Sequence, residues 1–188
     1  MANRLEVTSK VLDTRAEARK IKIESMGLKV DEVNIVDVFT IDSTNNSLDL
    51  EKAASMLSNP VTQEAGINQP KAPEEFDYAV EVGFLPGVTD NIGTTAREMV
   101  KDGLGVNLDG QGVYSSQLMF LRGDLTREGA LSVGDAFSNP VIQRASVKSF
   151  DEFTRDGGMG VSVPRVRLHE EPVAGLVSLL DASDEELA

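Results

Sequence analysis

The chain has 188 residues, of which 40% are hydrophobic and 26% are charged, as is usual for a globular domain with its own core. It contains no cysteine, which excludes disulfides, thiolate metal sites and a cysteine nucleophile and fits a reducing compartment. Its formal net charge of -13, without a basic cluster, argues against nucleic-acid binding. The sequence shows no secretory signal and no apolar run of membrane length, so we expect a cytoplasmic protein without a membrane partner.

The first part of the chain predicts two strands and two helices in alternation. Alternating apolar residues from Leu5 predict the first strand. A Thr-x-x-Glu capping pattern at Thr14 predicts a helix that Gly27 closes. A run with β-branched and aromatic residues ends at 38–41 and predicts the second strand. The second helix has an apolar stripe at helical spacing, formed by Leu50, Ala53, Ala54 and Leu57.

The same order of patterns returns about eighty positions later. Residues 58–63, Ser-Asn-Pro-Val-Thr-Gln, recur as 138–143 with a single difference. Val80 opens a strand pattern, and a second Thr-x-x-Glu start at Thr95 leads to a helix closed by Gly105. Residues 118–121 correspond to the earlier strand end. The second apolar stripe is formed by Ala130, Val133, Gly134 and Phe137.

These repeats predict an α+β fold, an α/β arrangement of two units of the same topology related by an internal pseudo-twofold axis. The first unit spans 1–67, a linker spans 68–75, and the second unit spans 76–155. A unit of this size leaves its sheet edges unpaired, so we expect antiparallel sheets packed with helices, joined face to face or edge to edge. Residues 156–188 are expected to form an extended tail, with a flexible glycine run at 157–160 and an edge strand at Val163–Leu168.

The last residues lead us to expect that the natural chain continues beyond Ala188. Ser183 to Glu186 form a capping box, but too few residues follow it to complete a helix.

No convincing set of catalytic residues is visible in the sequence, and no cofactor or metal site is predicted. His169, the single histidine, lies in a polar stretch without a serine motif, so a surface role is expected. The richest local pattern is a glycine-containing turn from a strand into a helix, which suits a helix cap, an interface or an anion held by backbone N–H groups. Its candidate residues are Pro86, Gly87, Thr89, Asp90, Asn91 and Thr95.

Four segments carry a resemblance to a known family: the two Asn-Pro-Val-x-Gln motifs, residues 80–91 (Val-Glu-Val-Gly-Phe-Leu-Pro-Gly-Val-Thr-Asp-Asn) and residues 95–98 (Thr-Ala-Arg-Glu). They are similar to the N-terminal region of phosphoribosylformylglycinamidine synthase, the glutamine-dependent ligase of purine biosynthesis. The resemblance extends over most of residues 4–169, and residues 179–187 are similar to the start of the family's helical linker. In this family a small PurS-like subunit forms a dimer, and single-chain enzymes carry a tandem version at the N-terminus.

The resemblance implies a non-catalytic assembly domain of an enzyme that converts formylglycinamide ribonucleotide, ATP and glutamine to formylglycinamidine ribonucleotide. ATP and Mg²⁺ are expected in the synthase domain, downstream in the same chain. The glutaminase cysteine is expected on another domain or subunit. The PurS-like part is expected to bridge these partners and to support ammonia transfer, with no catalytic residue and no cofactor of its own.

Two other functions stay open. The first is a tandem ferredoxin-like regulatory module that binds a small metabolite, with the anion at the Gly87–Thr95 turn. The second is a small independent enzyme that uses His169.

Overall fold

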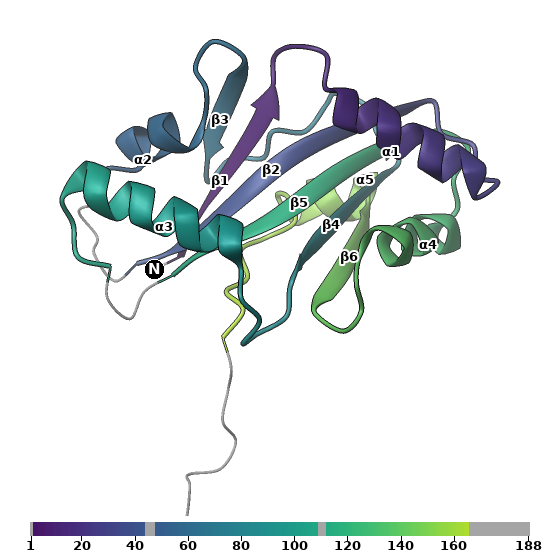
Figure 1. Ribbon diagram of the computed structural model, residues 1–188. Coiled ribbons are helices and arrows are strands. Elements are labelled where there is room, and N and C mark those ends of the chain that lie inside the picture. The colour runs from purple at the N-terminus through teal and green to yellow at the C-terminus, as the bar shows by residue number, and fades with distance from the viewer. Residues whose placement is uncertain (1, 44–47, 109–111, 166–188) are drawn as a thin grey trace, which may run out of the picture.

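The strands of the protein form one antiparallel sheet, as seen in a computed structural model that describes residues 2–43, 48–108 and 112–165 (Figure 1). The six-stranded sheet has the order β3-β1-β2-β5-β4-β6. The strands are β1 (Ala2–Ser9), β2 (Glu32–Asp42), β3 (Gln63–Ile67), β4 (Tyr78–Phe84), β5 (Gly112–Arg122) and β6 (Gln143–Ser149).

Four helices cover one face of this sheet, and a short fifth helix lies on the other (Figure 1). They are α1 (Thr14–Ser25), α2 (Leu50–Leu57), α3 (Asn91–Leu104), α4 (Arg127–Phe137) and α5 (Phe150–Arg155). The predicted α+β fold class is therefore confirmed. None of the helices in the described part of the chain has the length and apolar character that a bilayer crossing requires.

The two halves of the chain join edge to edge, because β2 pairs with β5 along its whole length. Shifting β1 by 75 positions, and β2 and β3 by 80, converts the strand pairings of the first half into those of the second. Two sets of partners show the correspondence: Leu5 faces Phe39 and Ile67, as Val80 faces Met119 and Val147. The halves thus share their strand order and their register.

Three apolar clusters form the core, two beneath the helices and one on the opposite face. The first cluster lies under α1 and α4 and includes the fully buried Ile23 and Val133. The second lies under α2 and α3 and includes the fully buried Ala53 and Val100. The third, on the other face, packs α5 against β2, β4 and β5. Successive side chains of a strand point to opposite faces of the sheet, so each strand contributes apolar residues to the core on both faces.

The helix starts differ from those predicted by the Thr-x-x-Glu patterns. The side chain of Asp13 caps α1, accepting a hydrogen bond from the N–H of Arg15, so Thr14 is already the first helical residue. Asp90 caps α3 by accepting from the N–H of Gly93. Thr95 lies a full turn inside α3. An aspartate is as effective a cap as a threonine, and the local pattern does not decide between neighbouring candidates.

The repeated Asn-Pro-Val-x-Gln motif forms the same locked turn in both halves. In the first half, the side chain of Asn59 accepts from the N–H of Val61, and the side chain of Gln63 accepts from the N–H of Asn59. The second half repeats both bonds at 139–143. The amide side chains thus replace backbone partners in a tight turn, which explains why the motif is repeated.

The segment after α5 lies on the second face of the sheet. The carbonyl oxygen of Gly158 accepts from the Lys148 ammonium, and that of Gly160 accepts from the Arg4 guanidinium. Two carbonyl groups of the glycine run therefore contact charged side chains of the sheet, and the expected flexibility of the run stays a prediction. Val163–Arg165 is not in a strand, contrary to the predicted edge strand, whose other residues, 166–168, lie outside the described residues. His169 and the capping box at Ser183 also lie outside them.

Candidate functional site

A cavity of about 460 Å³ lies on the helix-covered face, above the junction of β2 and β5. It separates the apolar cluster under α1 and α4 from the cluster under α2 and α3. Nine of its lining residues are apolar, and the other eight are charged residues, amides and serines. Its lining includes Arg15, Arg19, Asp37, Phe39, Leu57, Ile92, Gln117 and Phe137.

Many lining residues are equivalent positions of the two halves. The pairs are Val7 and Val82, Asp37 and Gln117, Phe39 and Met119, Leu57 and Phe137, and Gln63 and Gln143. Asp37 and Gln117 also face each other directly in the β2–β5 pairing. The cavity therefore lies where equivalent positions of the two halves face each other across the β2–β5 junction.

The helices α1 and α3 correspond as well, with an offset of 77 positions. Their capping residues, Asp13 and Asp90, and their fully buried residues, Ile23 and Val100, are both related by that shift. The glycines that close the two sequence patterns are one position further apart than this shift. The shift of 77 makes Ile92 on α3 the counterpart of Arg15 on α1.

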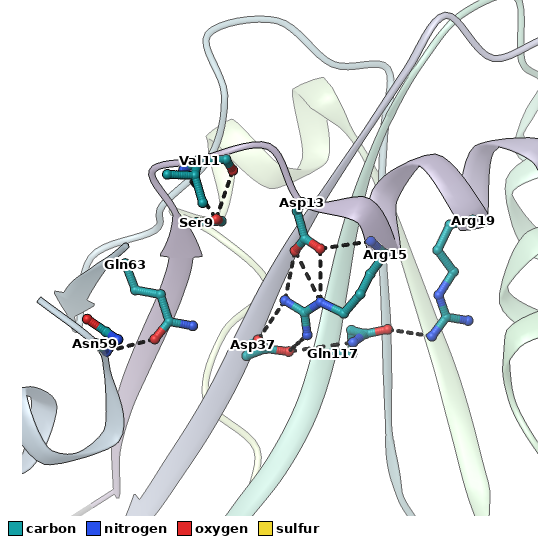
Figure 2. A network of polar contacts seen from close by, with 9 residues as sticks. All are labelled: Ser9, Val11, Asp13, Arg15, Arg19, Asp37, Asn59, Gln63 and Gln117. Carbon is teal, nitrogen blue, oxygen red and sulfur yellow. Dashed lines mark hydrogen bonds and ion pairs between the residues drawn. The ribbon is translucent and has the colours of Figure 1, made fainter. Parts of the chain in front are cut away.

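A chain of polar contacts runs from Arg15 on α1 through β2 to β5 and then back to α1 (Figure 2). The guanidinium of Arg15 donates to both carboxylates, at 2.8 Å to Asp13 Oδ2 and 2.9 Å to Asp37 Oδ2. The hydrogen bonds from Arg15 lower the pKa of Asp13 below its usual value. Asp37 in turn accepts from the carboxamide of Gln117 at 3.5 Å. Arg15 is thus neutralised by two carboxylates.

Arg19 ends this chain and has a different environment. Its Nη2 donates to Gln117 Oε1 at 2.7 Å, and its guanidinium lies 4.3 Å from the centre of the Phe137 ring. Within the described residues no carboxylate pairs with it. Burial, and then the like charge of Arg15, lower the pKa of Arg19. Arg19 therefore presents a half-buried positive charge with only neutral partners.

The predicted glycine-containing turn is held together by Asp90. This carboxylate is 8% exposed and accepts from the N–H groups of Gly93 and Ser115 and from the Ser115 hydroxyl. It fixes the start of α3 to β5. A negative charge already occupies the helix N-terminus, which disfavours a second anion there. An interface role for the turn stays a prediction.

The six candidate residues of this turn do not converge on one site. Gly87, Thr89 and Asp90 line an open cavity of about 560 Å³ together with Tyr114 and Arg165. The remaining three do not line it. Asn91 and Thr95 border an apolar groove between α2 and α3, and Pro86 is exposed.

Gly93 allows the close approach of α3 to β5, and we expect Gly93→Ala to destabilise the fold. A Cβ atom at Gly93 would collide with the backbone oxygen of Val113 and with the Asp90 carboxylate, neither of which can move freely. The expected loss in the free energy of unfolding is about 1–3 kcal/mol. Denaturant titration of the purified chain measures it.

The matched control for this change is Gly103→Ala in the same helix. Its Cβ would meet only the flexible end of Met56, and alanine favours a helix over glycine by about 1 kcal/mol. We expect this variant to be as stable as the parent or slightly more stable. Equal stability of the two variants would contradict the packing role assigned to Gly93.

Sequence reasoning missed the polar cluster of the cavity, because its members come from α1, β2 and β5 and no short motif connects them. Arg15 and Asp37 are 22 positions apart, and Arg19 and Gln117 are 98 apart. The described residues contain no group of three potential metal ligands. The chain matches no protein-family model, and no curated protein shows a significant match to it.

Proposed function

We propose that this chain is a non-catalytic assembly domain of a phosphoribosylformylglycinamidine synthase. In this role it bridges a synthase domain and a glutaminase domain or subunit in the cytoplasm and supports the transfer of ammonia between them. The synthase domain, with its ATP and Mg²⁺, is expected downstream in the same chain. The proposal rests on the similarity of residues 80–91, 95–98 and the two Asn-Pro-Val-x-Gln motifs to that family.

The observation that carries the proposal is the common register of the two halves. A tandem PurS-like protein requires two units of one topology that join as a dimer would. Here β2 and β5 pair along their whole length, and the pairings on either side correspond one to one. A common origin of the two halves by duplication is part of the proposal.

The two locked turns supply matching contact points for partners. Val61 and Val141, the apolar residues of the Asn-Pro-Val-x-Gln motifs, are 81% and 79% exposed. Each is held by the same amide hydrogen bonds. Rigid, exposed apolar residues lose little entropy when they are buried against a partner, so they suit an assembly surface.

Removal of residues 1–165 from the enzyme that contains them tests the proposal. We expect ATP binding to persist, while glutamine hydrolysis is no longer coupled to amide transfer. The measurement is the ratio of glutamate formed to formylglycinamidine ribonucleotide formed, which should rise well above one. A shortened enzyme that keeps the two reactions coupled would show that the proposal is wrong.

A finer test replaces both exposed valines in the intact enzyme, as Val61→Asp together with Val141→Asp. Both side chains are largely exposed, so the fold should tolerate the change, while a charge at each contact point should weaken the assembly. The control is Leu131→Asp, an exposed residue of α4 outside both turns. Equal coupling in the double variant and the control would exclude the turns as contact points.

The second candidate is a regulatory module that binds a small metabolite. The cavity above the β2–β5 junction favours it, because concave and largely apolar sites with a few polar groups are typical of ligand pockets. The anion was expected at the Gly87–Thr95 turn, but the Asp90 carboxylate already accepts from the Gly93 N–H of that turn and places a negative charge there.

A further inference from the structure

The cavity above the β2–β5 junction has a charged end and an apolar end. On the α1 side Arg15 and Arg19 reach it, whereas the equivalent positions of α3 are Ile92 and Ala96. Ile92 is 62% exposed and lies where the cavity meets the groove between α2 and α3. The cavity therefore has opposite chemical character at its two ends, although the backbone around it is equivalent.

At the polar end Arg19 is the guanidinium without a carboxylate partner among the described residues. Arg15 is bound by both Asp13 and Asp37, so its guanidinium offers no unneutralised charge. Arg19 has only the neutral oxygen of Gln117 and the face of an aromatic ring. Its stacked position leaves in-plane N–H groups without a hydrogen-bond partner among the described residues, in the geometry that suits a planar carboxylate.

We propose that this cavity binds a small organic acid with one carboxylate and an apolar or aromatic body. The carboxylate pairs with Arg19, and the body lies against Phe39, Leu57 and Ile92. A volume of about 460 Å³ falls within the usual range of small-molecule pockets, roughly 300–1,000 Å³. This inference does not rest on the proposed assembly role.

A single carboxylate fits the site better than a phosphate monoester does. A phosphate group carries about two charges near neutral pH, and the second one would have no cation of its own. Asp37 is separated from Arg19 by one carboxamide only, so its negative charge would repel that second charge. The amphipathic lining likewise favours a ligand with one polar end.

Titration of the 188-residue chain with phenylacetate, followed by NMR, tests the proposal. Phenylacetamide serves as the uncharged analogue, and inorganic phosphate serves as the multiply charged anion. We expect phenylacetate to shift the side-chain signals of Arg19 and Gln117 in a saturable way and to bind more tightly than either comparison compound.

Two variants and a matched control separate binding from folding. Arg19→Gln should weaken phenylacetate binding by about ten- to a hundredfold, because it removes a charge-assisted pair. Ile92→Glu changes an exposed residue, so the fold should tolerate the substitution. It should also weaken binding, because it places a negative charge at the apolar end of the cavity. Arg155→Gln removes an exposed guanidinium of α5, outside the cavity, and should leave the affinity unchanged.

Three results would overturn the proposal. The first is the absence of saturable shifts with phenylacetate. The second is equal affinity for phenylacetamide or for inorganic phosphate, because the proposed site selects a single negative charge. The third is unchanged phenylacetate affinity in Ile92→Glu and in a folded Arg19→Gln.

Discussion

Arg4→Met is expected to lower the free energy of unfolding by about 3–5 kcal/mol, because it leaves buried carboxylates without their cation. Arg4 is 8% exposed, on the sheet face opposite α1 to α4. Its guanidinium donates to Glu6 at 2.7 Å and to both oxygens of Glu81 at 2.9 and 3.0 Å. Glu6 is 2% exposed, and its other oxygen accepts from the Lys71 N–H. Methionine fills a similar volume but cannot neutralise either acid.

The matched control is Arg15→Met, because Arg15 also binds two carboxylates but has a side chain that is 47% exposed. Its loss should cost about 1 kcal/mol or less. Denaturant titration of both variants measures the difference. Similar losses in the free energy of unfolding of the two variants would show that the burial of Arg4 does not determine the effect.

The Arg4 guanidinium is charged in the folded protein. Burial alone lowers its pKa, but the carboxylates of Glu81 and Glu6 outweigh burial and raise it. The substitution therefore removes a full positive charge from between two carboxylates.

Phe120→Ala should also cost about 3–5 kcal/mol, because it opens a cavity in the aromatic cluster of the second face. Phe120 is 1% exposed, and its ring centre lies 4.7 Å from that of Phe76 and 5.4 Å from that of Phe153. Phe76 lies just before β4, and Phe153 belongs to α5, so the cluster holds both segments on the sheet. Hydrogen exchange of the α5 amides should therefore accelerate more than that of β2.

Phe150→Ala provides the comparison for this prediction. Phe150 is 41% exposed and contacts the cluster through Phe76, with ring centres 5.1 Å apart. Its removal exposes little new apolar surface, and a loss of about 1 kcal/mol is expected. Losses of equal size at the two positions would contradict a core centred on Phe120.

Local patterns in the sequence predicted most elements of the fold. The apolar stripes at Leu50 and Ala130 correspond to α2 and α4, and the strand patterns that end at 38–41 and 118–121 correspond to β2 and β5. Helix α5 was missed, although its capping box is visible as Ser149 followed three residues later by Glu152. These features depend on neighbouring residues, which explains why they can be read from the sequence.

Features that depend on distant contacts could not be predicted. Edge pairing of β2 with β5 and face-to-face packing of two separate sheets would bury the same apolar residues. The alternation of apolar and polar residues therefore does not distinguish the two arrangements. The Arg4–Glu81 pair joins positions 77 apart, and nothing near either residue indicates the other. The local sequence predicts that Asp90 belongs to a turn. Its bonds to Ser115 depend on β5, which lies beside the turn only in the folded chain.

The meeting of Asp37 and Gln117 shows what covalent linkage makes possible. Two identical subunits related by a twofold axis must place the same side chain on both sides of it. Paired aspartates would repel each other, and paired glutamines would deprive Arg15 of its second carboxylate. A single polypeptide does not have this constraint, so an acid and an amide can lie opposite each other at equivalent backbone positions. The two sides of the junction can then differ in charge although their backbones are alike.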